Sequence, residues 1–144
     1  MAGVITVTAA FNAGSTAITP VPAPSRTINV PAGPPQVRNL QAGERSTNSF
    51  QLLVSGFSST RSITRLNLQF TGAPESDLKT SSLSIDVEGP FTAWYGSTTG
   101  RSFGSQFTAS LVINVNGDVG AVQSVSVSAV NAQGTSSPVS VNLR

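Results

Sequence analysis

The chain has 144 residues, of which 38% are hydrophobic and 10% are charged, and its formal net charge is +2. This length suffices for one domain with its own core, with or without a short appendage. The absence of cysteine and histidine excludes disulfide scaffolds, thiol and imidazole catalysis, and the usual zinc sites. The eight basic residues are scattered along the sequence, so we expect no nucleic-acid partner. The abundance of small neutral polar residues favours a secreted protein in an extracellular or cell-surface location.

No apolar run approaches the roughly 18 residues of a membrane-spanning helix, so we expect no membrane span. The first residues also lack the basic segment and apolar core of a signal peptide. We therefore expect the chain to be a mature part of a longer protein.

Apolar and polar residues alternate along most of the chain, as they do in strands with one face in a core and the other in water. The clearest case begins at Phe107, and Val112 is its one apolar residue that faces outward. Turn residues separate about nine such segments, which predicts an all-β, two-sheet antiparallel sandwich. In chain order the expected strands lie at residues 4–11, 28–30, 37–40, 50–54, 66–70, 83–87, 107–115, 125–129 and 139–143.

Residues 1–32 are expected to form an N-terminal β-hairpin with Pro-rich connectors, ahead of a sandwich at residues 33–144. The connectors are residues 20–24 and 31–35, which should be extended because proline has no N–H to donate to a neighbouring strand. The hairpin is either the tail of a preceding module or an assembly element.

The first expected strand has an apolar face that needs a partner surface. This surface could belong to the chain's own sheet edge, to a neighbouring copy, or to a neighbouring module of a longer chain. We favour docking within the chain over exchange between copies, because local pairing requires less ordering of chain ends. The candidate assembly residues are Ile5, Val7, Ala9 and Phe11.

Two turns and one irregularity are predicted within the sandwich. Residues 116–118 and 131–134 contain the asparagine and glycine residues typical of turns between antiparallel strands. The apolar residues change from an odd position at Ile63 to even positions in the strand at 66–70. This change indicates a β-bulge or a segment that begins outside the sheet.

One segment departs from the strand pattern. Gly89-Pro90 precedes Phe91, Trp94 and Tyr95, a spacing that predicts one short helical turn near residues 90–95. We favour a role for this turn as a plug over one end of the sandwich, because the chain has few large rings for its core. The alternative is a carbohydrate-binding platform in which Trp94 and Tyr95 stack on sugar rings.

Side chains with catalytic potential are sparse. Asp86 and Glu88 lie two residues apart, as glycosidase carboxylates could, but the alternation places them in solvent. Lys79 lies among serine and threonine residues, which favours neither a Ser/Lys dyad nor an isopeptide crosslink. Acidic residues form no dense calcium loop. We therefore predict no enzyme, no catalytic residues, no cofactor and no metal site.

Several segments resemble those of a recurring Ig-like β-sandwich module in large secreted or surface proteins of environmental bacteria. This resemblance covers most of the chain and implies an Ig-like fold without an assigned activity. It also implies that residues 1–32 are the tail of the domain before it. The segments are Gly56 to Arg61, Phe91 to Tyr95, Phe103 to Phe107 and Val130 to Ser136.

Three classes of function follow from these observations. The first is a structural or adhesive extracellular module whose partners are other copies of itself or neighbouring modules. The second is a carbohydrate-binding module with glycan partners. The third is a capsid or filament subunit, because a sandwich with a detachable terminal hairpin is suited to assembly.

Overall fold

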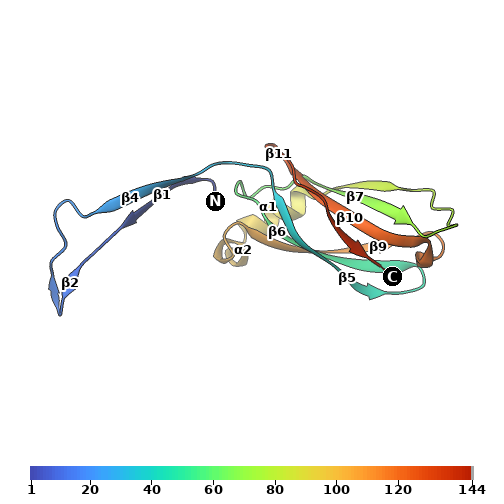
Figure 1. The fold of residues 1–144 in the computed structure, drawn as a ribbon, viewed down its shortest axis with the longest axis horizontal. Coiled ribbons are helices and arrows are strands. Elements are labelled where there is room, and N and C mark those ends of the chain that lie inside the picture. Colours follow the sequence, from blue (N-terminus) through green and yellow to red (C-terminus); the bar gives the residue numbers. More distant parts are fainter. Residues whose placement is uncertain (144) are drawn as a thin grey trace.

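The structure, a computed structural model that describes residues 1–143, consists of a two-stranded hairpin projecting from one end of a β-sandwich (Figure 1). We call this hairpin, residues 3–30, the arm. Its strands β1 (Gly3–Thr8) and β4 (Ser25–Val30) pair antiparallel over their full length. The short strands β2 (Asn12–Ala13) and β3 (Thr16–Ala17) form its tip.

The sandwich confirms the predicted all-β fold. One sheet has the order β5-β6-β9 and the other the order β11-β10-β7-β8, with β12 also paired to β10. All pairs are antiparallel. Counted along the chain, the first, second and fifth long strands of the sandwich form one sheet, and the remaining strands form the sheet that faces it. This connectivity is Ig-like. The strands are β5 (Gln36–Arg45), β6 (Ser49–Phe57), β7 (Arg65–Gly72), β8 (Ser82–Asp86), β9 (Gln106–Asn114), β10 (Val122–Asn131), β11 (Gly134–Thr135) and β12 (Val139–Asn142).

The core lies between the two sheets and is built from the inward residues of each strand. Along β9 burial alternates as predicted, although Leu111 and Ile113 are only half-buried because β9 is an edge strand. Burial is most complete on the central strands β6, β7 and β10. Their fully covered side chains include Leu52, Val54, Leu66, Leu68, Val125 and Val127.

One connection differs from the sequence-based prediction, and a second has one of the two arrangements that were predicted. Residues 116–118 do not join paired strands, because β9 and β10 belong to different sheets and a 3₁₀ turn, η1 (Val119–Ala121), leads from one to the other. Turn residues indicate that the chain reverses its direction, but they do not indicate which sheet the chain enters next. The segment before β7 lies outside the sheet, which was one of the two predicted arrangements.

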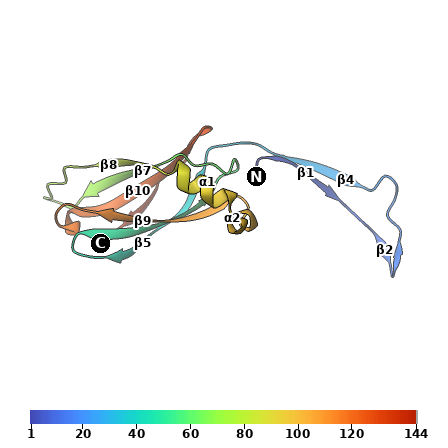
Figure 2. The ribbon, with the colours of Figure 1, turned by 180° about the vertical axis from the view of Figure 1, so that it is seen from behind.

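Two helices, rather than one helical turn, cover the arm end of the sandwich (Figure 2). They are α1 (Glu88–Gly96) and α2 (Thr98–Ser102). Ser97 ends the first helix and caps the second, because its Oγ accepts a hydrogen bond from Gly100 N at 2.9 Å. Gly100 is required there, since a Cβ atom would lie 2.0 Å from the carbonyl oxygen of Trp94. Neither helix of residues 1–143 is long and apolar enough to cross a membrane.

The two flanks of the sandwich are unequal. On one flank β12 lies against β5, and Arg45 Nη1 donates a hydrogen bond to the carbonyl oxygen of Leu143 at 2.7 Å. On the other flank the edge strands β8 and β9 pair only with β7 and β6 respectively, within the described chain. The sandwich is therefore closed along one side and open along the other.

Two adjacent leucines on β6 test the register. Leu52 is fully buried between the sheets, whereas Leu53 is half-buried on the outer face. We expect Leu52→Ala to lower the free energy of unfolding by about 2–5 kcal/mol, as large-to-small core substitutions do. Leu53→Ala should cost much less. Urea denaturation of both variants measures the difference, and equal losses would contradict this register.

Candidate functional site

The arm is the least covered part of the molecule. Its strands pair with each other and, among the described residues, with neither sheet of the sandwich. Ile5 is 49% exposed, Val7 is 55% exposed and Ile28 is 51% exposed. The predicted docking of this strand on the chain's own sheet edge is therefore not observed.

Directly opposed residues of an antiparallel pair share a face. Ile5 lies opposite Ile28, and Val7 lies opposite Arg26. These four residues, together with Gly3 and Val30, lie on one face of the arm, which we call the apolar face. The opposite face carries Val4, Thr6 and Thr8 of β1 opposite Asn29, Thr27 and Ser25 of β4, and is mainly polar.

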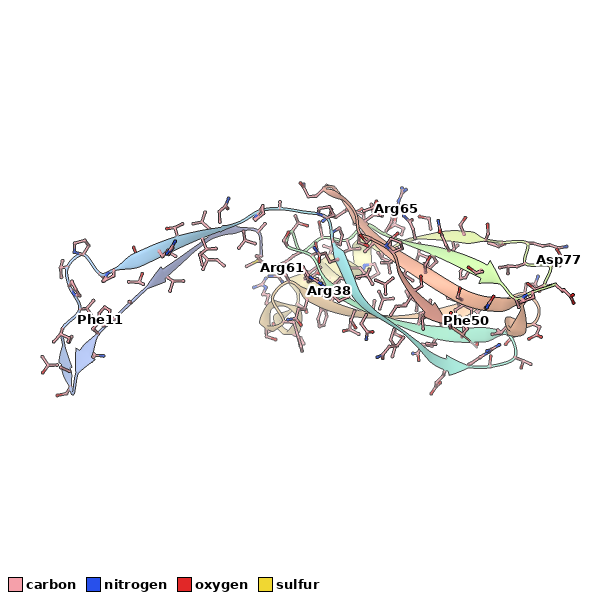
Figure 3. The ribbon with its side chains drawn as sticks, in the orientation of Figure 1. Phe11, Arg38, Phe50, Arg61, Arg65 and Asp77 are labelled. Carbon is pink, nitrogen blue, oxygen red and sulfur yellow. The ribbon has the colours of Figure 1, made fainter. Side chains whose placement is uncertain are left out.

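The candidate assembly residues are not all on this face. Strand β1 ends at Thr8, so the predicted alternation does not continue to Ala9 and Phe11. Phe11 lies at the tip (Figure 3) and is 48% exposed. Its backbone N–H donates to Thr19 Oγ1 at 2.8 Å, which helps to order the tip.

A hydrogen-bond network holds the root of the arm against the sandwich. Gly33 N donates to Ser59 Oγ at 3.1 Å, and Asn131 Nδ2 donates to the Gly33 carbonyl oxygen at 3.1 Å and to Thr60 Oγ1 at 2.9 Å. Ser58, fully buried, donates to the carbonyl oxygen of Ser62 at 3.0 Å. Because buried polar groups are costly when unpaired, this network fixes the point from which the arm leaves the sandwich.

Arg61 joins the root of the arm to α1. Its backbone is in the left-handed region, with φ 54°, which is uncommon for a residue with a side chain. Its guanidinium donates to the carbonyl oxygen of Tyr95 and lies 5.4 Å from the centre of the Tyr95 ring. It also lies 3.5 Å from the sulfur atom of Met1. Arg61 therefore has a defined structural position (Figure 3), which its isolation in the sequence did not indicate.

Tyr95 is a buried part of the sandwich end. It is 5% exposed, its hydroxyl donates to the Ser105 carbonyl oxygen at 3.2 Å, and its ring packs against Phe91. Tyr95 therefore does not form a surface platform with Trp94. This arrangement corrects the predicted pair, because consecutive residues of a helix point in different directions.

Trp94 instead lines a shallow groove with other aromatic residues. Trp94 is half-buried, and its Nε1 donates to the Gln106 carbonyl oxygen at 3.3 Å. Its ring centre lies 5.9 Å from that of Phe103, which is 55% exposed. The groove has a volume of about 820 Å³ and also includes Phe57, over whose ring Arg38 lies at 5.2 Å. Sequence reasoning missed Phe103, Phe57 and Arg38, because no spacing links these three residues.

A second cavity of about 710 Å³ lies at the far end of the sandwich, on its open flank. Residues from both unpaired edges line it, including Leu83 of β8 and Ile113 of β9. Phe70 and Leu78, both only partly buried, contribute to its apolar wall. The polar residues Asp77, Lys79 and Asp118 also line this cavity.

The remaining candidates for chemistry do not form a cluster. Asp86 Oδ1 accepts a hydrogen bond from Glu88 N at 3.0 Å, and both residues are exposed. Lys79 lies 3.7 Å from Asp77, and both side chains are more than 80% exposed. Residues 1–143 contain no group of three or more acidic side chains placed to hold a metal ion.

Comparison with protein-family models, curated proteins and solved structures finds no match for the chain. The resemblance to a module of bacterial surface proteins therefore stays a prediction. The arm, the groove and the far-end cavity are the features of the structure that bear on function.

Tyr95 offers a test of the packed sandwich end, because it is the chain's one tyrosine. Burial raises the pKa of Tyr95 to about 12, and the positive charge of Arg61 partly opposes this rise. A raised pKa means that the neutral phenol is favoured by folding. The contribution of Tyr95 to stability should be complete below pH 10 and lost as the pH rises toward 12.

The measurement is the ultraviolet absorbance of the phenolate. We expect a midpoint near pH 12 in the folded protein and about 10 in denaturant. Arg61→Met, which keeps the length of the side chain but removes the charge, should move the folded midpoint higher. A folded midpoint near 10 would show that the ring is accessible to water.

Proposed function

We propose that the chain is a non-catalytic, extracellular structural module that associates with other copies of itself through strands of its arm. The observation that supports this proposal is the ordered arm with an uncovered apolar face. An isolated two-stranded hairpin is marginally stable in water. A partner surface that covers Ile5, Val7 and Ile28 would supply the missing stabilisation.

The backbone of the arm supports the same proposal. In the described chain, β1 and β4 each pair on one side only, so each presents a row of free N–H and C=O groups on its other side. Addition of such strands to a sheet edge is a common mode of protein association. A structural module, or a capsid or filament subunit, requires no reactive side chains, so the exposed residues Asp86, Glu88 and Lys79 have no part in this proposed role.

The groove beside α2 favours a second candidate function, the binding of carbohydrate. Trp94, Phe103 and Phe57 supply aromatic surface, while Gln106 and Thr108 supply polar atoms. Aromatic faces with a few polar neighbours are suited to the mixed surface of a sugar ring. This candidate uses Trp94 but not Tyr95.

Substitutions that place negative charges on the apolar face of the arm test the first proposal. We expect the wild-type chain to form species larger than a monomer, and the double variant Ile5→Asp/Val7→Asp to be a folded monomer, because buried carboxylates would be costly. The control is Thr6→Asp/Thr8→Asp, which adds the same charge to the opposite face. Light scattering after size-exclusion chromatography measures the masses. A wild-type chain that stays monomeric as its concentration is raised would contradict self-association.

Fluorescence tests the second proposal, because Trp94 is the chain's one tryptophan. Titration with soluble oligosaccharides derived from cellulose, xylan and chitin should produce a saturable change in emission if the groove binds sugar. Phe103→Ala should weaken binding by about two- to tenfold, since stacking on one ring contributes about 0.5–1.5 kcal/mol. Phe11→Ala, at the distant arm tip, is the control. Absence of any change with all three sugars argues against this function.

A further inference from the structure

We propose that the arm of one copy occupies the open flank of the next copy, between its edge strands β8 and β9, so that copies join head to tail. This inference rests on the proposed function and names its partner surface. The occupant is a second copy of this chain, and the surface it fills includes the cavity lined by Leu83, Ile113, Phe70 and Leu78.

The first argument concerns free strand edges. Among the described residues, four long strands have a hydrogen-bonded neighbour on one side only and do not lie against another edge strand in the way that β5 lies against β12: β1 and β4 of the arm, and β8 and β9 of the sandwich. The arm supplies two free edges on the outside of one hairpin, and the flank supplies two free edges on either side of one opening. Insertion of the arm would pair β1 with β9 and β4 with β8, and would thereby satisfy all four edges.

The second argument concerns strand direction. The strands of the arm and of the sandwich run roughly along the same long axis of the molecule (Figures 1 and 2). Strand β1 runs from the root of the arm to its tip and β4 returns, while β9 runs from the helical end of the sandwich to the far end and β8 runs back. When an arm enters the far end of the next copy tip first, β1 is antiparallel to β9, and β4 is antiparallel to β8. Both new pairs would then be antiparallel, as every pair in the chain is.

A half turn of the arm about the long axis would place β4 beside β9 and β1 beside β8, and both pairs would then be parallel. The antiparallel match therefore requires head-to-tail order together with the orientation that places β1 beside β9. Lengths are also compatible, because the six residues of β1 extend about 20 Å and the nine of β9 about 30 Å, at about 3.3 Å per residue.

The third argument concerns the surfaces that would meet. The apolar face of the arm carries Ile5, Val7 and Ile28, with Arg26 opposite Val7 toward the tip. The opening presents the partly buried Ile113 and Leu111 of β9, and Leu83, which is 41% exposed. An arm inserted with its apolar face inward would cover these side chains and extend the core between the two sheets. Arg26 lies on the same face, and its long side chain allows the guanidinium to extend past the apolar contacts to a polar partner or to water.

The fourth argument concerns charge. The arm and the adjacent end of the sandwich carry five arginines, with only Asp86 and Glu88 as acidic residues. The far end carries four acidic residues against Arg45 and Lys79, among residues 1–143. Figure 3 shows Arg38 and Arg61 beside the arm and Asp77 at the opposite end. Head-to-tail order therefore brings a basic end against an acidic end, whereas contact between like ends would be repulsive. The five arginines are Arg26, Arg38, Arg61, Arg65 and Arg101, and the four acidic residues are Glu44, Glu75, Asp77 and Asp118.

The test uses two full-length variants that each block one side of the contact. Ile5→Asp/Val7→Asp blocks the arm and leaves the flank intact, while Leu83→Asp blocks the flank and leaves the arm intact. Leu83 is chosen because its exposure allows a charge without loss of the core. The control is Val112→Asp, which places a charge on the outer face of β9, where the side chain is 63% exposed. Thermal melting followed by circular dichroism establishes that each variant is folded.

We expect each blocked variant alone to be a monomer, and a mixture of the two to give a heterodimer of twice the monomer mass and no longer chain. Val112→Asp should assemble as the wild type does. Assembly of Leu83→Asp to wild-type size, with loss of assembly only in the arm variant, would show that arms bind each other, which overturns this inference and leaves self-association through the arm intact. A folded mixture that stays monomeric also overturns the inference. A monomeric wild-type chain overturns both proposals.

Discussion

The structure depends on one constraint: the apolar face of every strand needs a covering surface. In the sandwich each sheet provides that surface for the other, and Leu52 and Val54 of one sheet are as fully covered as Leu66 and Val127 of the other. The cover is less complete at the edges, where Ile113 and Leu83 remain partly or largely exposed. The arm has no cover of its own on either face. The exposed apolar side chains at the sheet edges and on the arm therefore mark the surfaces that are suited to contact a partner.

Polar interactions at the root of the arm act together with this constraint. Asn131, which is 5% exposed, connects the chain that leaves the arm to the loop that contains Thr60. Such buried groups add little net stability, but leaving one of them unpaired is costly. The network therefore serves to fix the position of the root more than to hold the sandwich together. Arg61, which contacts Met1 and Tyr95, adds a second attachment at the same place.

Much of the fold could be predicted from the sequence, because alternation along a strand is a local signal. The segment at Phe107 shows its buried and exposed positions directly, and all nine expected segments contain a strand. The path after Asn116 could not be predicted, because a turn sequence does not specify which sheet the chain enters next. The second helix was missed because Thr98 to Ser102 has no apolar periodicity and is stabilised by the cap at Ser97.

The candidate site was less predictable for a related reason. The groove combines Trp94, Phe103 and Phe57 from three separate elements, and only packing in three dimensions brings them together. The predicted partner of Trp94 was its neighbour Tyr95, whose ring points into the core instead. The apolar residues of β1 could be identified from the sequence, but their lack of cover within the chain could not. Whether a strand has a partner is a property of the whole fold.

The common direction of the arm and the sandwich strands has a mechanical consequence. Antiparallel hydrogen bonds lie perpendicular to their strands, so a pull along the long axis would act across every bond of a strand pair at the same time. A pull perpendicular to that axis would open the bonds one after another. An assembly of copies joined along the axis would therefore resist stretching far better than peeling, and tension along the chain of copies would load the arm in shear.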